Sequence, residues 1–340
     1  DSIHARAWDD DQYQAELAKD PGVHWICINC HLPLYDQQAA LPVGIEDGDL
    51  RKPILETNPT YSETLRDDAI GCAGCHVRDG FVEGPTGEAA AAPHATRRSP
   101  NLESSEFCLR CHGVEVRVEQ LDLVCAFATG REWGEWSGDQ ETPRTCQSCH
   151  MPEVEHQRWV GAPVAPGSLH AFPGSLIPKR PSDAAAFEAR QSQFPEGLTA
   201  TVAFEPAMPR RGQRAELVVT LTNDKAGHSV PTGDPERYIE ARIVIADEKG
   251  TVLLEQVEVS RAKFEWHPTP KLLSDNRITA GEARTYRIPF DVGNAQGLVG
   301  EVQVHKYRID EEALHYHHLQ DKVVAGRPSS AVSVKTPTGS

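Results

Sequence analysis

The chain has 340 residues and a formal net charge of −16 at pH 7, with 50 Asp and Glu against 34 Lys and Arg. This balance excludes nucleic acid as an expected partner, because binding to phosphates requires a basic face. It fits a basic protein partner, or charge that simply keeps the chain soluble. No run of about 18 apolar residues occurs, so we expect no membrane span. Aromatic residues make up only 6% and Gly and Pro number 26 and 25, so core-forming residues are scarce.

Four copies of the pattern Cys-x-x-Cys-His follow one another through the first half of the chain. Their first cysteines are 45, 36 and 38 residues apart, and the copies use eight of the nine cysteines. In this pattern the two thiols form thioethers with a porphyrin and the histidine becomes the proximal iron ligand, so it is the attachment site of c-type haem. We therefore expect four haem c groups. The thioether residues are Cys27, Cys30, Cys72, Cys75, Cys108, Cys111, Cys146 and Cys149. The proximal ligands are His31, His76, His112 and His150.

Each motif fits a short helix, since one helical turn brings both thiols and the histidine to the same side. Stretches rich in Gly, Pro and Ala between the motifs, such as 84–87 and 89–93, are typical of loops. With few apolar residues of its own, this half of the chain needs the porphyrins to bury surface. We expect a haem-cored, loop-rich, mostly α-helical N-terminal domain.

The pattern changes after a boundary at residues 173–197, where prolines flank a short helix expected at 182–191. Apolar residues then alternate with polar ones, as in 215–221, 239–245 and 286–290. This period of two predicts an all-β C-terminal domain, an immunoglobulin-like antiparallel sandwich. We expect a tetrahaem cytochrome c domain at 1–185, the sandwich at 196–312, and a C-terminal tail at 313–340 that packs on the body.

The histidine and methionine counts restrict the second axial ligands. The chain has 15 histidines and two methionines. Met151 directly follows a proximal histidine, so its thioether cannot reach the far face of the same haem. Histidine–methionine ligation of all four haems is therefore excluded, and bis-histidine ligation is expected, which implies lower reduction potentials.

Several segments resemble the multihaem cytochrome c superfamily that includes cytochrome c554 and hydroxylamine oxidoreductase. Residues 2–7 (SIHARA) are similar to its S-x-H-A-x-A element, and residues 149–152 (CHMP) and 170–174 (HAFPG) to two further elements. Residues 71–112 are similar to its second-to-third haem segment, which carries a lone ligating histidine. Residues 226–233 (AGHSVPTG) resemble the GHxxPTG turn of cytochromes that carry a C-terminal sandwich.

The resemblance implies one distal histidine for each haem: His4, His94, His170 and His228. His24, three residues before the first haem cysteine, is the alternate ligand. If His228 binds iron, the sandwich contributes to a haem site. The cluster His315, His317 and His318 is interpreted as a solvated surface segment, and the ninth cysteine, Cys125, as a small buried apolar residue.

Four bis-histidine haems have no open iron position, which favours electron transfer without substrate turnover. One alternative is a multihaem oxidoreductase with one open haem that acts on a small nitrogen or sulfur compound, since the superfamily contains carriers and enzymes. The lack of a CxxCK motif argues against it. Another is a subunit of a polymeric cytochrome filament for extracellular electron transfer, in which a terminal histidine such as His4 serves a neighbouring chain.

The haem chemistry also bears on location and partners. In bacteria c-type haem is attached outside the cytoplasmic membrane, so we expect an exported protein, periplasmic or extracellular. No signal peptide is visible, and the numbering is expected to begin at the mature protein. The expected partners are a redox protein donor and acceptor, with a homo-oligomer or filament as the further alternative.

Overall fold

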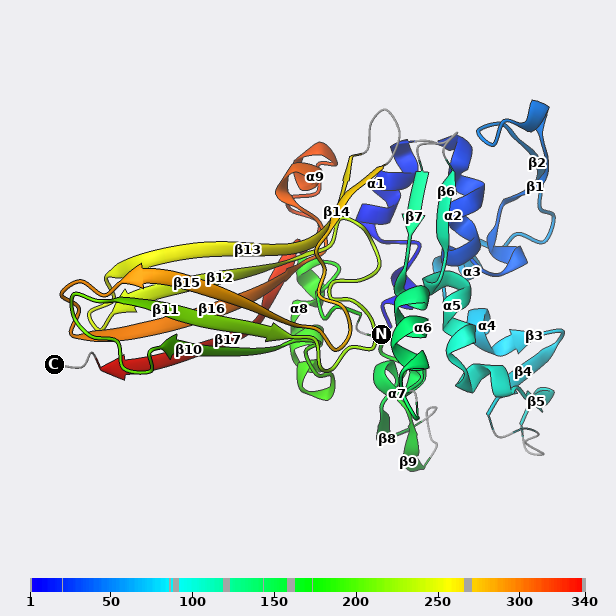
Figure 1. The fold of residues 1–340 in the computed structure, drawn as a ribbon. Coiled ribbons are helices and arrows are strands. Elements are labelled where there is room, and N and C mark those ends of the chain that lie inside the picture. Colours follow the sequence, from blue (N-terminus) through cyan, green and yellow to red (C-terminus); the bar gives the residue numbers. More distant parts are fainter. Residues whose placement is uncertain are drawn as a thin grey trace. The chain divides into compact units, whose positions relative to one another are not determined.

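The structure is a computed structural model, shown in Figure 1. It describes residues 2–19, 21–85, 87, 92–118, 123–142, 144–157, 163–172, 174–265 and 271–337. Most of the predicted loop at 89–93 lies outside the described residues, as does the side chain of Cys125. The chain divides into two units, which are described separately below. The first comprises Asp1–Val124, Arg144–Phe194 and Leu314–Val324. The second comprises Cys125–Pro143, Pro195–Ala313 and Ala325–Ser340.

All four Cys-x-x-Cys-His motifs form short helices, as predicted, and each helix ends at the proximal histidine. These are α2 (His24–His31), α4 (Cys72–His76), α5 (Ser105–His112) and α7 (Cys146–His150). The remaining helices described in the first unit are α1 (Asp11–Lys19), α3 (Glu63–Asp67) and α8 (Ala184–Glu188). The helix expected at 182–191 is thus shorter than predicted. None of the described helices has the length and apolarity needed to cross a bilayer.

The fold class predicted for the N-terminal half, loop-rich and mostly α-helical, is wrong. Strands account for 36% of the structure and helices for 27%. Among the described residues, the segments between the motif helices pair into three small sheets, and the segment after the fourth motif forms one more. These contain β1 (Ala40–Ile45) with β2 (Pro53–Thr57); β3 (Val77–Arg78), β4 (Phe81–Gly84) and β5 (Thr96–Arg98); β6 (Glu115–Val118) with β7 (Leu123–Ala126); and β8 (Glu153–Gln157) with β9 (Val164–Ser168).

Turn chemistry explains why these connections are strands. Asp79 and Gly80, between β3 and β4, have φ angles of 53° and 79°. Asp47 and Gly48, between β1 and β2, have φ angles of 50° and 75°. Asp-Gly pairs in this left-handed region favour tight turns between paired strands, and the pairing satisfies the backbone groups of these segments.

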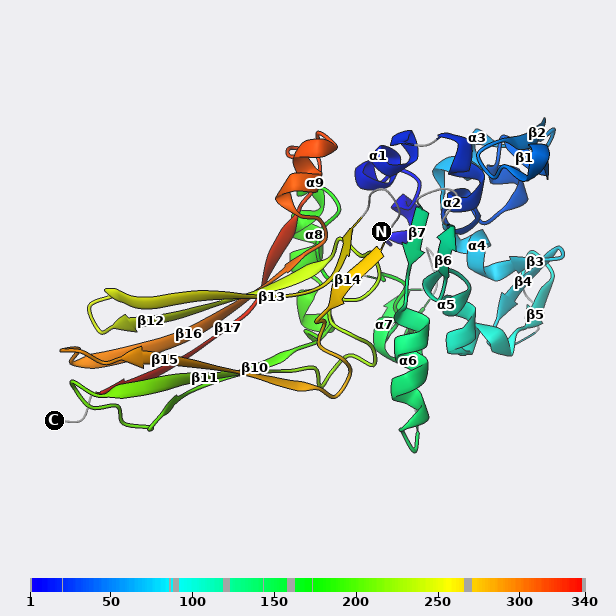
Figure 2. The same cartoon turned by 45° about the horizontal axis from the view of Figure 1, so that its top comes forward.

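The second unit contains two antiparallel sheets, seen as separate layers in Figure 2. The three-stranded sheet has the order β10 (Thr199–Glu205), β11 (Arg214–Thr222), β15 (Ala283–Asp291). The five-stranded sheet has the order β14 (Lys271–Asp275), β13 (Val252–Glu265), β12 (Tyr238–Asp247), β16 (Gly297–Tyr307), β17 (Gly326–Pro337). The unit also contains α6 (Thr129–Gly138), and α9 (Glu311–Tyr316) begins within it.

One apolar core joins the inner faces of the two sheets. Leu217 and Val219 of β11 and Ile243 and Ile245 of β12 are each 0% exposed. Side chains two residues apart in a strand point to the same face, so the alternation read in the sequence becomes a buried face on each sheet. This core, with its strands, fixes the loop that carries His228.

The boundaries of the two units differ from those of the expected domains. Residues 125–143, which lie between the third and fourth motifs, group with the sheets of the second unit. Residues 326–337, expected in the tail, form β17 and pair along β16. Val332 and Val334 of β17 pack on the apolar core, which explains why this segment is a strand.

Candidate haem-binding site

The third and fourth motifs lie side by side in the first unit. The backbone N–H of Cys146 donates to Oγ of Ser105 at 3.1 Å, which joins the first residues of α7 and α5. Nε2 of Gln147 donates to the carbonyl oxygen of Ser104 at 2.6 Å. The Thr145 side chain caps α7 by accepting from the backbone N–H of Ser148 at 3.2 Å. The local sequence around each motif thus holds the two short helices together.

Interactions between cysteine thiols of different motifs bring the four motifs close together in the first unit. A hydrogen bond between the thiols of Cys30 and Cys111 lowers the pKa of Cys30 to about 7 and raises that of Cys111. The equivalent contact between Cys108 and Cys146 lowers the pKa of Cys146 to about 6. Cys75 of the second motif raises the pKa of Cys108 further, through its charge. The eight motif cysteines therefore belong to one region of the first unit.

Two proximal histidines carry the hydrogen bond typical of metal ligands. Nδ1 of His31 lies 2.8 Å from the carbonyl oxygen of Ala7, and Nδ1 of His76 lies 2.7 Å from that of Glu83. A carbonyl oxygen only accepts, so each Nδ1 carries the proton and Nε2 carries the lone pair that binds a metal. Burial also lowers the pKa of His31, which favours its neutral imidazole, the form that can bind a metal.

The same hydrogen bond occurs at two of the predicted distal histidines. Nδ1 of His170 lies 2.8 Å from the carbonyl oxygen of Ser168, and Nδ1 of His228 lies 2.9 Å from that of Ser229. In both rings the backbone carbonyl engages Nδ1, which leaves Nε2 as the nitrogen that can bind a metal. Burial lowers the pKa of His228 as well.

Two predicted distal histidines face proximal ones. The ring centroids of His4 and His112 are 6.0 Å apart, and those of His76 and His170 are 5.9 Å apart. Metal–imidazole bonds of about 2 Å and a ring radius of about 1.2 Å place the centroids of a bis-histidine iron site about 6.4 Å apart. Each pair is therefore within about 0.5 Å of the centroid spacing of two imidazoles on one iron atom.

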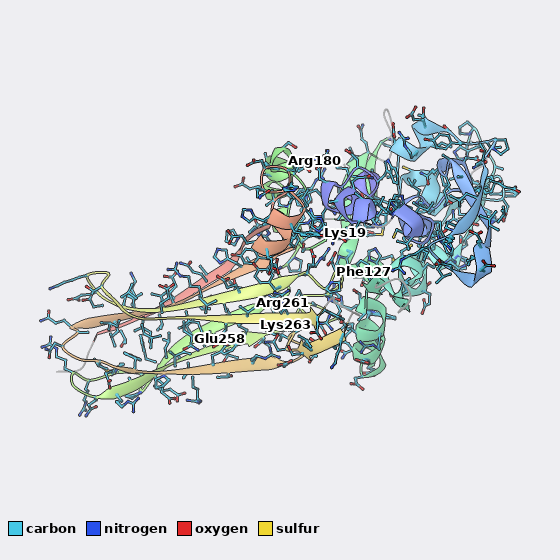
Figure 3. All side chains as sticks on the ribbon, turned by 90° about the horizontal axis from the view of Figure 1, so that it is seen from above. Lys19, Phe127, Arg180, Glu258, Arg261 and Lys263 are labelled. Carbon is cyan, nitrogen blue, oxygen red and sulfur yellow. The ribbon has the colours of Figure 1, made fainter. Side chains whose placement is uncertain are left out.

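His4 is held firmly although it lies near the end of the sequence. Arg180, labelled in Figure 3, binds Asp11 at 2.7 Å and Asp9 at 2.9 Å through its guanidinium. The backbone N–H of Ile70 donates to the carbonyl oxygen of His4 at 3.2 Å. Two further ion pairs join the same segments, Arg6 with Asp183 and Lys179 with Asp10. Burial, with a smaller contribution from His112, lowers the pKa of His4 to about 4, so its imidazole is neutral.

For the other predicted ligands, the described contacts do not identify which motif histidine each would face. His94 is exposed in a bend between β4 and β5, and His228 belongs to the second unit, so their pairing with proximal histidines stays a prediction. Nε2 of the alternate ligand His24 is bonded to the carbonyl oxygen of Leu17. Of the cluster near residue 315, His317 is not solvated as expected: its side chain is 5% exposed and pairs with Glu16 at 3.0 Å.

Sequence reasoning missed the aromatic residues around the histidines. The ring of Tyr13 stacks on His31, with centroids 3.6 Å apart and planes within 3°. The ring centroid of Phe172 lies 4.6 Å from that of His4 and 5.8 Å from that of His170, so it neighbours both predicted distal ligands. Phe172 belongs to the HAFPG element, but that element indicated only His170 as a candidate ligand. Tyr13 has no comparable signal, because a tyrosine in a polar helix is unremarkable in sequence.

Comparisons with known proteins agree with this geometry. No protein-family model matches the chain, and no curated protein matches it. Among solved structures, the chain is similar to a penta-haem cytochrome c552 from Thermochromatium tepidum, with a TM-score of 0.66 and 16% identity. That likeness covers 98% of this chain and 94% of the other. The chain thus has the fold of a multihaem cytochrome c.

Two further similarities cover only part of the chain. The C-terminal domain of wzt covers 42% of this chain and 74% of its own, with a TM-score of 0.23 and 9% identity. A CARDB domain from Pyrococcus furiosus covers 43% of this chain and 91% of its own, with a TM-score of 0.23 and 15% identity. Scores this low support no conclusion.

Proposed function

We propose that the protein transfers electrons through four c-type haems, each ligated by two histidines. The observation that carries the proposal is the pairing of a motif histidine with a histidine outside the motifs, at 6.0 Å for His112 with His4 and at 5.9 Å for His76 with His170. When bound, the haems supply one-electron redox chemistry. The chain supplies their attachment, their axial ligands and their shielding from water.

The packing of the first unit suits large apolar cofactors. Its buried apolar cluster consists of Ala171, Leu176 and Phe194, among the residues that the structure describes. The second unit, in contrast, has a continuous core between two sheets. A domain of this size buries most of its apolar surface when folded, so we propose that porphyrins serve as packing partners in the first unit.

The contacts between histidines support the following ligand set. His4 serves the haem of the third motif and His170 that of the second. His94 and His228 then serve the haems of the first and fourth motifs, in an order that the ligand count leaves open. We leave His24 out of the proposed set, since its Nε2 contacts the carbonyl oxygen of Leu17. The number four rests on the four motifs, whereas the similar protein is described as penta-haem.

With both axial positions occupied, iron has no place for a substrate, so the proposed role is that of an electron carrier. We place the protein in the periplasm or at the cell surface, where c-type haem is attached, between a donor and an acceptor protein. The charge of −16 favours partners with a basic docking face, and such encounters weaken as ionic strength rises.

Haem content and ligation test the proposal. The mass of the denatured holoprotein should equal that of the chain plus four haems, all retained after acid–acetone extraction. Near-infrared magnetic circular dichroism of the oxidised protein should show the charge-transfer band of bis-histidine haem alone. A histidine–methionine band, or a mass with fewer haems, contradicts the proposal.

A further inference from the structure

The loop that carries His228 is bonded to a carboxylate on α6, a helix that precedes the fourth motif in sequence. The Glu132 side chain is 5% exposed. One of its oxygens accepts from the backbone N–H of Ser229 at 3.1 Å and from Oγ1 of Thr232 at 2.7 Å. These two residues flank the turn that follows His228. Glu132 therefore fixes the loop at both of its ends.

The loop is also held from the side of the sheets. The amide nitrogen of Asn223, which is 1% exposed, donates to the carbonyl oxygen of His228 at 2.8 Å and to that of Ile278 at 2.9 Å. Val230 and Ile278 exchange backbone hydrogen bonds at 2.9 and 3.1 Å. The backbone of His228 thus lies between a rigid strand-end contact and the carboxylate on α6.

The environment of Glu132 identifies it as a buried charge with a defined partner. Nη1 of Arg277 binds the second oxygen of Glu132 at 2.7 Å, and Nη2 of Arg277 binds Asp275 at 2.6 Å. A buried carboxylate is costly unless all its acceptor positions are used, and here backbone, hydroxyl and guanidinium groups use them. Glu135 on the same helix is different: it is 66% exposed and pairs with Arg131 at 3.2 Å.

The geometry points to Glu132 as a positioning residue for the imidazole of His228, which it holds in place through Ser229 and Thr232. This inference rests on the proposed function, in which His228 is a haem ligand. Because Nδ1 of His228 is bonded to the carbonyl oxygen of Ser229, movement of Ser229 turns the ring. Glu132 thereby determines how tightly the iron keeps its sixth ligand, although it does not contact the iron.

Carbon monoxide binding to the reduced holoprotein tests this inference, because carbon monoxide replaces only an axial ligand that leaves the iron. We expect His228→Ala to bind one carbon monoxide per chain and to show one high-spin haem when oxidised. Glu132→Ala should bind carbon monoxide about tenfold faster than the wild type, the factor that corresponds to one charged hydrogen bond of about 1.4 kcal/mol. Its oxidised spectrum should show one shifted low-spin signal.

Three further variants separate positioning from folding. Thr232→Val keeps the shape of the side chain but removes the hydrogen bonds of its Oγ1 to Glu132 and to Oγ1 of Thr129. Because the bond from Ser229 to Glu132 remains, this variant should accelerate carbon monoxide binding less than Glu132→Ala. Glu132→Gln keeps an acceptor oxygen and should restore most of the wild-type rate. The control Glu135→Ala should behave as the wild type does.

The outcomes distinguish the inference from the proposed function. If His228→Ala leaves the spectra and carbon monoxide binding unchanged, His228 is not a ligand and the proposed ligand set fails. If His228→Ala has its expected effect while Glu132→Ala and Thr232→Val match the wild type, the inference is overturned and the ligand set stands. If Glu132→Ala does not fold, Thr232→Val decides: wild-type kinetics in that variant overturn the inference.

Discussion

His170 faces His76, with ring centroids 5.9 Å apart, although the two residues come from distant parts of the chain. His76 ends the helix of the second motif, and His170 follows the β8–β9 hairpin that begins after the fourth. The backbone N–H of Leu169 donates to the carbonyl oxygen of Pro152 at 3.0 Å, which closes the base of this hairpin. The fourth motif thus carries the hairpin whose end supplies the proposed distal ligand of the second haem.

Replacing His170 with alanine should convert one haem in four from low-spin to high-spin iron, because the sixth ligand is lost. Resonance Raman spin-state marker bands of the oxidised protein measure the fraction. The matched control is His315→Ala, which removes an exposed imidazole bonded to Gln320 at 2.6 Å. Unchanged marker bands in His170→Ala contradict the assignment of His170 to iron.

Replacing Arg180 with alanine should loosen the segment that carries His4. Its pairs with Asp9 and Asp11 are partly exposed, so we expect a loss of about 1 kcal/mol in the free energy of unfolding. Hydrogen exchange at the amides of residues 3–11 should accelerate, since the pairs oppose local opening. Arg180→Lys should recover part of the protection. Equal exchange in Arg180→Ala and the wild type contradicts the anchoring role.

The contribution of Asp275 to the stability of the second unit should be lost in acid. Burial raises the pKa of Asp275, but hydrogen bonds from Arg277 outweigh it and hold the pKa below its usual range. A depressed folded-state pKa gives stability that is present above the unfolded pKa of about 3.9 and is lost as the pH falls through the lower folded value. The difference in unfolding free energy between wild type and Asp275→Asn should therefore shrink below about pH 4. A difference independent of pH between 6 and 3 contradicts this reading.

Gly227, next to His228, allows Trp136 to pack directly on the loop. A Cβ at Gly227 would lie 2.7 Å from the Trp136 ring, so Gly227→Ala should destabilise the protein by about 1–3 kcal/mol. Gly134 on α6 is the control, because a Cβ there meets nothing within 4 Å and alanine favours a helix. Thermal unfolding compares the two. Equal melting temperatures for the two variants contradict the close packing.

Loss of the haems should affect the two units unequally. In a chain with all motif cysteines replaced by serine, the first unit loses its cofactors, whereas the second unit keeps a core of residues such as Leu217 and Ile243. We expect amide protection to persist in β11, β12 and β16 and to collapse in the motif helices. Protection of α5 and α7 at wild-type levels contradicts the role of haem in stabilising the first unit.

Much of the candidate site could be predicted because c-type haem attachment has a local signature. The cysteines and proximal histidines lie within five consecutive residues, so no tertiary information is needed. The strands of the second unit were also visible as alternation, in Leu217 and Val219 for example. The strand β17 could not be predicted in this way. Most of its residues are polar or small, and it forms a strand by pairing with β16.

The N-terminal strands were missed for a different reason. Asp47-Gly48 and Asp79-Gly80 are recognised hairpin signals. The strands that flank them are only two to six residues long, too short to show a clear period of two. Glu132 had no sequence signal, since a glutamate beside Arg131 in a helix is typical of a solvated face. Its burial follows only from the packing of α6 against the loop of Ser229 and Thr232.

Electron paramagnetic resonance of the oxidised native protein, with the spins quantified, tests the central claim most directly. Iron between two imidazoles is low-spin, so the account predicts low-spin ferric signals that integrate to four per chain and no high-spin signal. A high-spin signal that integrates to one haem per chain contradicts the claim, because one iron would then lack its distal histidine.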